Sequence, residues 1–166
     1  MSTLDDLKAG FAGESMANRK YLAFAQKADA EGLAQVARIF RAAAEAETVH
    51  AHSHLRAMGG IKDTASNLQE AVEGEAYEYV TMYPEFIARA EAEGHKAALA
   101  SFKWAMEAEK VHHALYSKAL AAVKAGQKLP ELPLFICTVC GDVAEGAAPE
   151  RCPICHVGRD KYREIK

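Results

Sequence analysis

Two copies of the pattern Glu-x-x-His are the residues of this chain best suited to chemistry. Glu47 with His50 and Glu109 with His112 repeat the same spacing 62 positions apart. Residues three apart lie on one face of a helix, so each pair directs a carboxylate and an imidazole toward one point. Both groups are common ligands of transition metals. The pattern therefore predicts a metal site to which two helices contribute.

The two patterns belong to a longer internal repeat of helical character. At the same offset of 62, three aromatic residues of the first copy match three of the second: Tyr21 with Tyr83, Phe24 with Phe86, and Phe40 with Phe102. Upstream, Gly13-Glu14 matches Gly74-Glu75 at an offset of 61, so the second copy holds one extra residue before Tyr83. An extra residue within a helix predicts a π-bulge, which is frequent at functional sites.

Glu14 and Glu75 complete a set of four carboxylates and two imidazoles. Four carboxylates would neutralise two ferrous ions in an interior that otherwise penalises buried acids. A single Glu-x-x-His arises by chance more often than as a ligand pair, but two at equivalent positions, each with a repeated Gly-Glu, favour metal. Glu78, one turn after Glu75, is either a fifth ligand or an ordinary surface acid. Tyr21 and Tyr83 either pack in the core or hydrogen-bond beside the metal.

Four cysteines form a second candidate site. Cys137 and Cys140 make one Cys-x-x-Cys pair, and Cys152 and Cys155 make another, with eleven residues between the pairs. Such pairs bind one tetrahedral metal through four thiolates, either zinc or a single iron. Iron here, beside a di-iron site, would form an electron-transfer chain, whereas zinc would have no redox role.

The expected fold is mainly α, with a four-helix bundle and a small C-terminal β/loop domain. Helices are expected over about 4–30, 33–58, 67–94 and 95–125, with Thr3 capping the first and Ser66 or Asn67 the third. Each is roughly 40 Å long, in the proportions of a four-helix bundle. The expected domains are the bundle over 1–126, a linker over 127–134 and the metal-bound cysteine domain over 135–166.

Composition excludes several classes of function. The net charge of −3 argues against a nucleic-acid partner, which normally needs a basic patch. No apolar run approaches the roughly 18 residues of a membrane span, and the first six residues lack the basic start of a signal peptide. We therefore expect a cytoplasmic protein without a membrane or nucleic-acid partner, whose cysteines bind metal and do not form disulfides.

With both constellations in place, the chain resembles the rubrerythrins, over nearly its whole length. The resemblance is carried by Phe11-Ala12-Gly13-Glu14-Ser15, Glu47-x-x-His50, Gly74-Glu75-x-x-Glu78, Met82-Tyr83-Pro84, Glu109-x-x-His112 and the cysteine pairs. It implies a ferritin-like di-iron bundle with a rubredoxin-like C-terminal domain. It further implies a peroxidase that reduces hydrogen peroxide to water, supplied with electrons from NAD(P)H through a small carrier protein or reductase.

The resemblance also implies roles for single residues. Glu47 and Glu109 would bridge the two irons, Glu14 and Glu75 would be terminal ligands, and His112 would bind the second iron.

The first iron would move between Glu78 when oxidised and His50 when reduced, with Tyr21 and Tyr83 hydrogen-bonded around the site. One departure is His156, which stands where rubredoxin-type pairs often have glycine, at a place expected to need a positive φ.

Two other functions use the same residues. A ferritin-like ferroxidase would handle iron with the same bundle ligands, although it needs no cysteine domain for electron entry. A non-enzymatic module with zinc in the four-cysteine site would be colourless.

The link between the second and third helices predicts a homodimer that exchanges helix pairs. In a ferritin-like bundle these helices run parallel, so the link must climb roughly 28 Å. Nine steps from Met58 to Asn67 reach only about 31 Å when fully extended. Crossing to a second chain relieves this strain, as in domain swapping.

Overall fold

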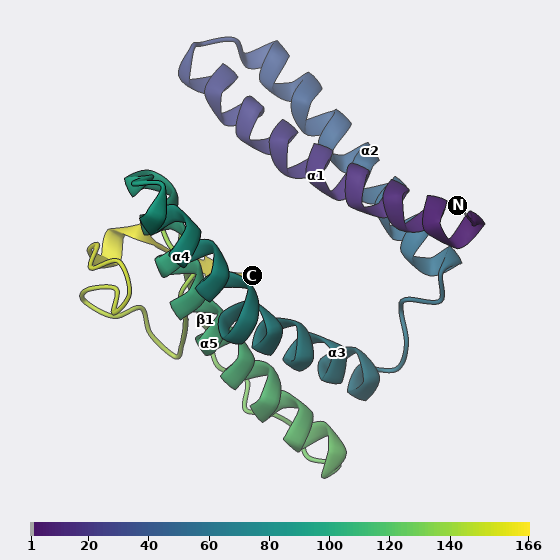
Figure 1. The fold of residues 1–166 in the computed structure, drawn as a ribbon, viewed down its shortest axis with the longest axis vertical. Helices are drawn as coiled ribbons and strands as arrows, with labels where there is room; N and C mark the ends of the chain where they lie inside the picture. The colour runs from purple at the N-terminus through teal and green to yellow at the C-terminus, as the bar shows by residue number, and fades with distance from the viewer. Residues whose placement is uncertain (1) are drawn as a thin grey trace. The chain divides into compact units, whose positions relative to one another are not determined.

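The computed structural model describes residues 2–166, which form two compact units that meet between Lys62 and Asp63. The first unit is a hairpin of α1 (Thr3–Ala30) and α2 (Ala34–Ala57), which lie side by side in Figure 1. Their contact is lined by small side chains, of which Ala25, Ala28 and Ala37 are buried, with Phe40 packed against them. Small side chains allow two helices to approach closely, so the hairpin has an alanine core.

The first helix begins with a capping box. The Ser2 hydroxyl accepts from the Asp5 backbone N–H, while the Asp5 carboxylate accepts from the Ser2 backbone N–H. The expectation that Thr3 caps this helix was therefore wrong by one residue. Each of these hydrogen bonds satisfies a backbone donor that the helix itself leaves unpaired.

The second unit begins with a long interrupted helix. It comprises α3 (Thr64–Tyr77), a π-helical segment (Glu78–Met82) and α4 (Tyr83–Ala92), and it packs on α5 (Lys96–Lys124). The predicted π-bulge is confirmed, and it lies between Glu75 and Tyr83 as the offset required. The expected cap of α3 was wrong. Asp63 caps this helix in place of Ser66 or Asn67, because its carboxylate accepts a hydrogen bond from the Ser66 backbone N–H at 3.0 Å.

The sequence repeat is also a structural repeat. In the first unit, the ring centroid of Tyr21 is 6.4 Å from that of Phe24 and 6.2 Å from that of Phe40, and the two phenylalanine centroids are 5.6 Å apart. The matching rings in the second unit, those of Tyr83, Phe86 and Phe102, are 6.1, 6.3 and 5.5 Å apart. The two hairpins thus use the same aromatic packing at the same positions.

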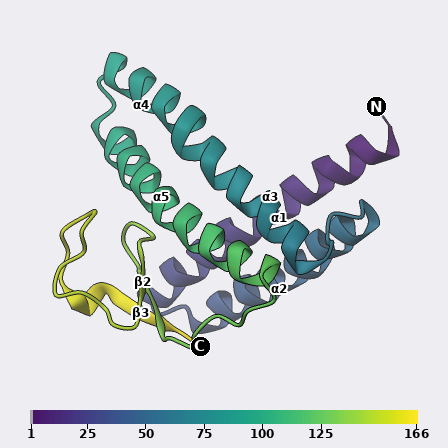
Figure 2. The ribbon, with the colours of Figure 1, turned by 90° about the horizontal axis from the view of Figure 1, so that it is seen from below.

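The C-terminal region is a small three-stranded antiparallel sheet with long loops. Strands β1 (Leu134–Cys137), β2 (Val143–Glu145) and β3 (Tyr162–Ile165) are arranged in the order β2-β1-β3, and Figure 2 shows β2 and β3 on the same side of α5. An ion pair of 2.8 Å between Lys118 and Glu145 joins α5 to this sheet. The domain limits expected at residues 126 and 135 stay a prediction. No helix within residues 2–166 has the length and apolar character needed to cross a membrane.

Candidate metal centres

The first unit brings together three of the predicted ligands. Glu14 on α1 and Glu47 and His50 on α2 each offer a ligand atom, and these atoms lie within 4.8 Å of one another. The His50 Nδ1 is 3.0 Å from a Glu47 carboxylate oxygen. The hydrogen bond with His50, and then one with Glu14, lower the pKa of Glu47. This group therefore presents two carboxylates and one imidazole at a single point.

The second unit holds the matching group. Glu75 on α3 and Glu109 and His112 on α5 also place ligand atoms within 4.8 Å of one another. The His112 Nδ1 is 2.7 Å from a Glu109 oxygen and 3.8 Å from Glu75 Oε2. Burial, and then the neighbouring Glu109, raise the pKa of Glu75 to about 7. The repeat thus produces two similar half-sites, one in each unit.

A buried oxygen of Glu75 shows that the second half-site fits a cation. Glu75 Oε2 is buried without a hydrogen-bond partner. Burying an unpaired carboxylate oxygen is costly, and a bound cation would provide the missing interaction. The donor set of carboxylates and imidazoles is also one that iron accepts.

His112 has a fixed tautomer that suits metal binding. Its Nε2 is 2.9 Å from the backbone carbonyl oxygen of Gly141, and because a carbonyl only accepts, Nε2 carries the proton. In the neutral ring, the lone pair then lies on Nδ1, which faces Glu109 and Glu75. Metal-binding histidines commonly donate their other ring N–H in this way. Sequence reasoning missed Gly141, since 29 residues separate it from His112.

The remaining bundle residues differ in their surroundings. Glu78 opens the π segment and is not part of the three-residue group, but burial and the charge of Glu109 raise its pKa. Burial, and then the charge of Glu109, also raise the pKa of Tyr83. These two side chains therefore lie in the field of the second half-site. The Tyr21 ring, in contrast, contacts the rings of Phe24 and Phe40.

The four cysteines lie together in the C-terminal region. Their sulfur atoms are within 4.8 Å of one another, with Cys137 Sγ 3.7 Å from Cys155 Sγ and Cys140 Sγ 3.4 Å from Cys152 Sγ. All four are free thiols. Burial raises the pKa of Cys140 and of Cys155. Four converging thiols without a disulfide fit a single tetrahedral metal.

One cysteine is a favoured thiolate. Burial opposes the ionisation of Cys152, but hydrogen bonds, the first of them from the Cys155 backbone N–H, outweigh burial and lower its pKa to about 6. A thiolate is the form in which cysteine binds metal. The lowered pKa of Cys152 therefore favours metal binding by this thiolate.

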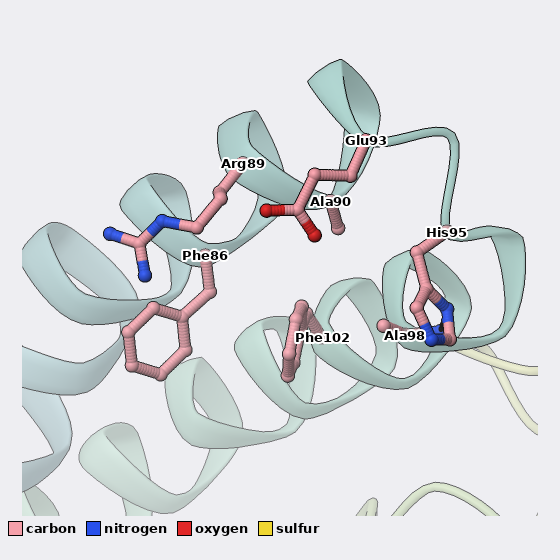
Figure 3. A pocket seen from close by; sticks show the side chains of 7 residues that line it. All are labelled: Phe86, Arg89, Ala90, Glu93, His95, Ala98 and Phe102. Carbon is pink, nitrogen blue, oxygen red and sulfur yellow. Dashed lines mark hydrogen bonds between the residues drawn. The ribbon is translucent and has the colours of Figure 1, made fainter.

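A hollow elsewhere in the second unit is not part of these centres. It has a volume of about 310 Å³ and lies between α4 and α5 (Figure 3), lined by Phe86, Arg89, Ala90, Glu93, His95, Ala98 and Phe102. No predicted metal ligand lines it. The His95 ring Nδ1 already accepts a hydrogen bond from the Ala98 N–H and caps α5. His95 is thus explained by helix capping.

Comparison with known proteins decides the family. The family model described as "Rubrerythrin" matches residues 5–120, and that described as "Rubrerythrin, rubredoxin-like domain" matches residues 135–163. The chain belongs to the rubrerythrin family. Rubrerythrin-2 of Clostridium acetobutylicum is 33% identical to it, over 97% of this chain and 95% of the relative. Nigerythrin of Nitratidesulfovibrio vulgaris is 37% identical, over 97% and 85%.

Solved structures agree with this membership. A structure titled as the fully reduced, all-ferrous state of nigerythrin has a TM-score of 0.59 and 34% identity, and the match covers 99% of this chain and 87% of that one. The expected architecture of a rubrerythrin is confirmed: a mainly helical, ferritin-like fold with a small C-terminal region of strands and loops that carries four cysteines. The chain also has the family's two kinds of metal site, the Glu/His groups of a di-iron site and the rubredoxin-like four-cysteine site.

Proposed function

We propose that this rubrerythrin is a cytoplasmic di-iron peroxidase that reduces hydrogen peroxide to water, with electrons entering through iron in the four-cysteine site. The observation that supports this most is the hydrogen bond from His112 to the Gly141 carbonyl, because it joins a ligand of one site to a neighbour of Cys140 in the other. Two ferrous ions in the Glu/His groups would supply the two electrons that peroxide needs.

The chain's own residues would hold the irons and the protons. We assign Glu47 and Glu109 as bridging ligands, Glu14 and Glu75 as terminal ligands, and His112 as ligand of the second iron.

Glu78 and His50 would alternate on the first iron. Because burial raises the pKa of Glu78, its carboxyl group can hold a proton when it is not a ligand. The Tyr83 hydroxyl, whose pKa is also raised, keeps its proton and can donate a hydrogen bond to an oxygen of bound peroxide. The same role is assigned to Tyr21 in the first unit.

Electron supply involves a partner protein. The path we propose runs from Cys140 through the Gly141 carbonyl to the His112 ring, a route of bonded atoms and one hydrogen bond of 2.9 Å. A small electron-carrier protein or reductase, linked to NAD(P)H, would reduce the four-cysteine iron one electron at a time.

We also propose that the active unit is a homodimer with exchanged hairpins. If Glu47 and Glu75 stand at one level of a bundle with α2 parallel to α3, the link must rise about 31 Å. Seven steps from Ala57 to Thr64 reach only about 25 Å. The link from Ala57 to Thr64 is shorter than the sequence suggested and too short for that geometry within one chain, which supports a site completed by a hairpin from a second chain.

Replacing Glu109 tests the peroxidase proposal. Glu109→Ala should remove a bridging ligand and lower peroxidase turnover by at least about 100-fold, with loss of iron from the bundle site. Glu107→Ala, which removes an exposed carboxylate paired with Lys110, should leave both unchanged. Steady-state peroxide consumption and iron content per chain are the measurements. Full turnover and full iron content in Glu109→Ala would overturn the assignment.

A further inference from the structure

The four-cysteine region contains a buried acid that metal ligation does not use. Asp142 follows Cys140-Gly141 and is only 4% exposed. Among residues 2–166, Asp142 and Asn18 are the two buried residues with polar or charged side chains. Asn18 is accounted for by its hydrogen bonds to the Ala44 carbonyl and Thr48 hydroxyl within the first hairpin. A buried carboxylate is costly unless it is paired, so the partners of Asp142 are informative.

Asp142 has one hydroxyl partner and one sulfur neighbour. The Tyr162 hydroxyl donates to Asp142 Oδ2 at 2.5 Å, and Cys152 Sγ is 4.0 Å from the same oxygen. The Asp142 backbone also approaches the metal site, since its N–H hydrogen-bonds to the sulfur of Cys140. Asp142 is therefore in contact with both cysteine pairs.

The hydrogen bond of the Tyr162 hydroxyl goes to the acid. The Tyr162 hydroxyl interacts with both Asp142 and Cys152, and its hydrogen bond to Asp142 Oδ2 is 2.5 Å long. A phenol has only one proton to donate. When the proton lies toward Asp142, the sulfur of Cys152 does not receive it.

We propose that Asp142, held in place by Tyr162, lowers the reduction potential of iron bound by the four cysteines. A metal-bound thiolate has no proton to give, so the Asp142 carboxylate faces Cys152 as a negative charge that only the Tyr162 hydroxyl partly screens. Negative charge close to an iron–sulfur site, at low exposure, stabilises ferric over ferrous iron. Asp142 also accepts the Tyr162 hydroxyl proton in a hydrogen bond, so this proton is not donated to a cysteine sulfur. Hydrogen bonds to the sulfurs raise the reduction potential, so withholding this one lowers the potential further. Asp142 is a positioning and tuning residue that makes the site a stronger electron donor.

The test compares Asp142→Asn with Glu164→Gln in the full chain, reconstituted anaerobically with ferrous iron. Asparagine has nearly the same shape but no charge, and it leaves the Tyr162 proton free for Cys152. Glu164 is an exposed carboxylate on β3 of the same region, so its replacement controls for a general change of charge. The measurement is a redox titration of the ferric–thiolate absorption, which does not depend on peroxidase activity.

At a fixed ambient potential, Asp142→Asn should raise the ferrous-to-ferric ratio of this site at least tenfold, which is about 59 mV for one electron. Glu164→Gln should change the ratio less than twofold. A change of less than threefold in Asp142→Asn, or any fall in the ratio, overturns the proposal.

Tyr162→Phe decides the matter if Asp142→Asn does not bind iron. Losing the hydroxyl leaves the Asp142 charge without its screening proton, so the ferrous-to-ferric ratio should fall at least threefold. An unchanged or raised ratio in this variant overturns the proposal. A purely structural role for the pair would weaken metal retention in both variants without moving the potential in the stated directions.

Discussion

His156 is the one residue other than glycine with a positive φ among residues 2–166, at 63°. The resemblance to rubredoxin-type cysteine pairs predicted a positive φ at this position, and the structure confirms it. The left-handed region costs a residue with a Cβ atom roughly 1–2 kcal/mol, while glycine adopts it freely but loses more chain entropy on folding. His156 thus carries a strain that the turn after Cys155 imposes.

Replacing His156 with glycine should therefore stabilise the cysteine region. For His156→Gly we expect a gain of about 1 kcal/mol, seen as a higher midpoint for thermal release of zinc from the zinc-loaded chain. His52→Gly, inside α2, should instead lower the free energy of unfolding by about 1 kcal/mol, because glycine weakens a helix. If His156→Gly lowers the release midpoint, the histidine makes a favourable contact that outweighs the strain.

Glu75 gives the second half-site a pH dependence. Its pKa in the metal-free fold, about 7, is above the ordinary 4.5. Its contribution to the stability of the metal-free chain is therefore fully present below about pH 4.5 and is lost as the pH rises through about 7. Because metal binds the carboxylate, binding should release about one more proton at pH 6 than at pH 8.5.

Calorimetry can count these protons. With the cysteine site first filled with zinc, cobalt binding would be measured in buffers of different ionisation enthalpy. The difference between the two pH values should disappear in Glu75→Gln and persist in Glu73→Gln, an exposed residue of the same helix. The same proton difference in Glu75→Gln and in the native chain would assign the titration to another group.

At the residue scale, the sequence was sufficient where chemistry depends on local spacing. Glu109 and His112 are three residues apart on one helix, so their convergence could be predicted without a structure. Asp142 and Tyr162 were not recognised, because 20 residues separate them and neither belongs to a ligand pattern. Contacts of that kind depend on how the loops fold back.

At the scale of elements, the π segment determines how the second hairpin presents its ligands. It inserts one residue between Glu75 and Tyr83 and so sets the rotation of α3 relative to α4. Deleting one residue would turn one helix against the other by about 100°, given 3.6 residues per turn. A ligand or its tyrosine neighbour would then leave the site.

Deleting Thr81, an exposed residue of the π segment, tests this. The shortened chain should keep its helix content but lose at least about tenfold in metal affinity at the bundle site. Thr81→Ala keeps the chain length and should bind metal as the native chain does. Unchanged affinity and peroxidase activity after the deletion would show that the π segment does not position the ligands.

The elements also show where sequence patterns are ambiguous. The interiors and C-terminal ends of the helices were predicted well because Gly32, Gly59, Gly94 and Gly126 mark left-handed turns. The starts were less certain, since Ser2, Thr3, Asp63 and Ser66 are all good caps and only the backbone geometry selects among them. The correction at Asp63 has a consequence for the whole molecule, because it lengthens α3 and shortens the link.

At the scale of the whole molecule, the two half-sites raise the question of which chains combine to form a site. Large apolar side chains of the first hairpin remain exposed, including Ile39 at 60% and Val49 at 63%. Its buried core is made of alanines. A helix pair with a small-residue core and exposed larger side chains is typical of one that packs on another pair. The short link favours a pair from a second chain.

Mixing inactive chains tests the exchange. Glu47→Ala and Glu109→Ala chains, each inactive alone, would be unfolded together in equal amounts, refolded and loaded with iron. In an exchanged heterodimer, one site combines the intact first hairpin of one chain with the intact second hairpin of the other. With random pairing, about a quarter of all sites are then intact, so peroxidase activity should recover to about a quarter of the native value. Without exchange, every site keeps one damaged half and no activity returns.

A second mixture tests the same exchange, and in this one the exchange of hairpins lowers the retained activity. Native chains mixed equally with chains carrying both replacements should retain about a quarter of the native activity per total chain if hairpins are exchanged, because heterodimers then contain no intact site. Without exchange they should retain about half, since every native chain keeps its own site. Native and doubly replaced chains refolded separately and then combined provide the control, and they should give about half in either case. Retention of half in the co-refolded mixture, with heterodimers present, would refute the exchange.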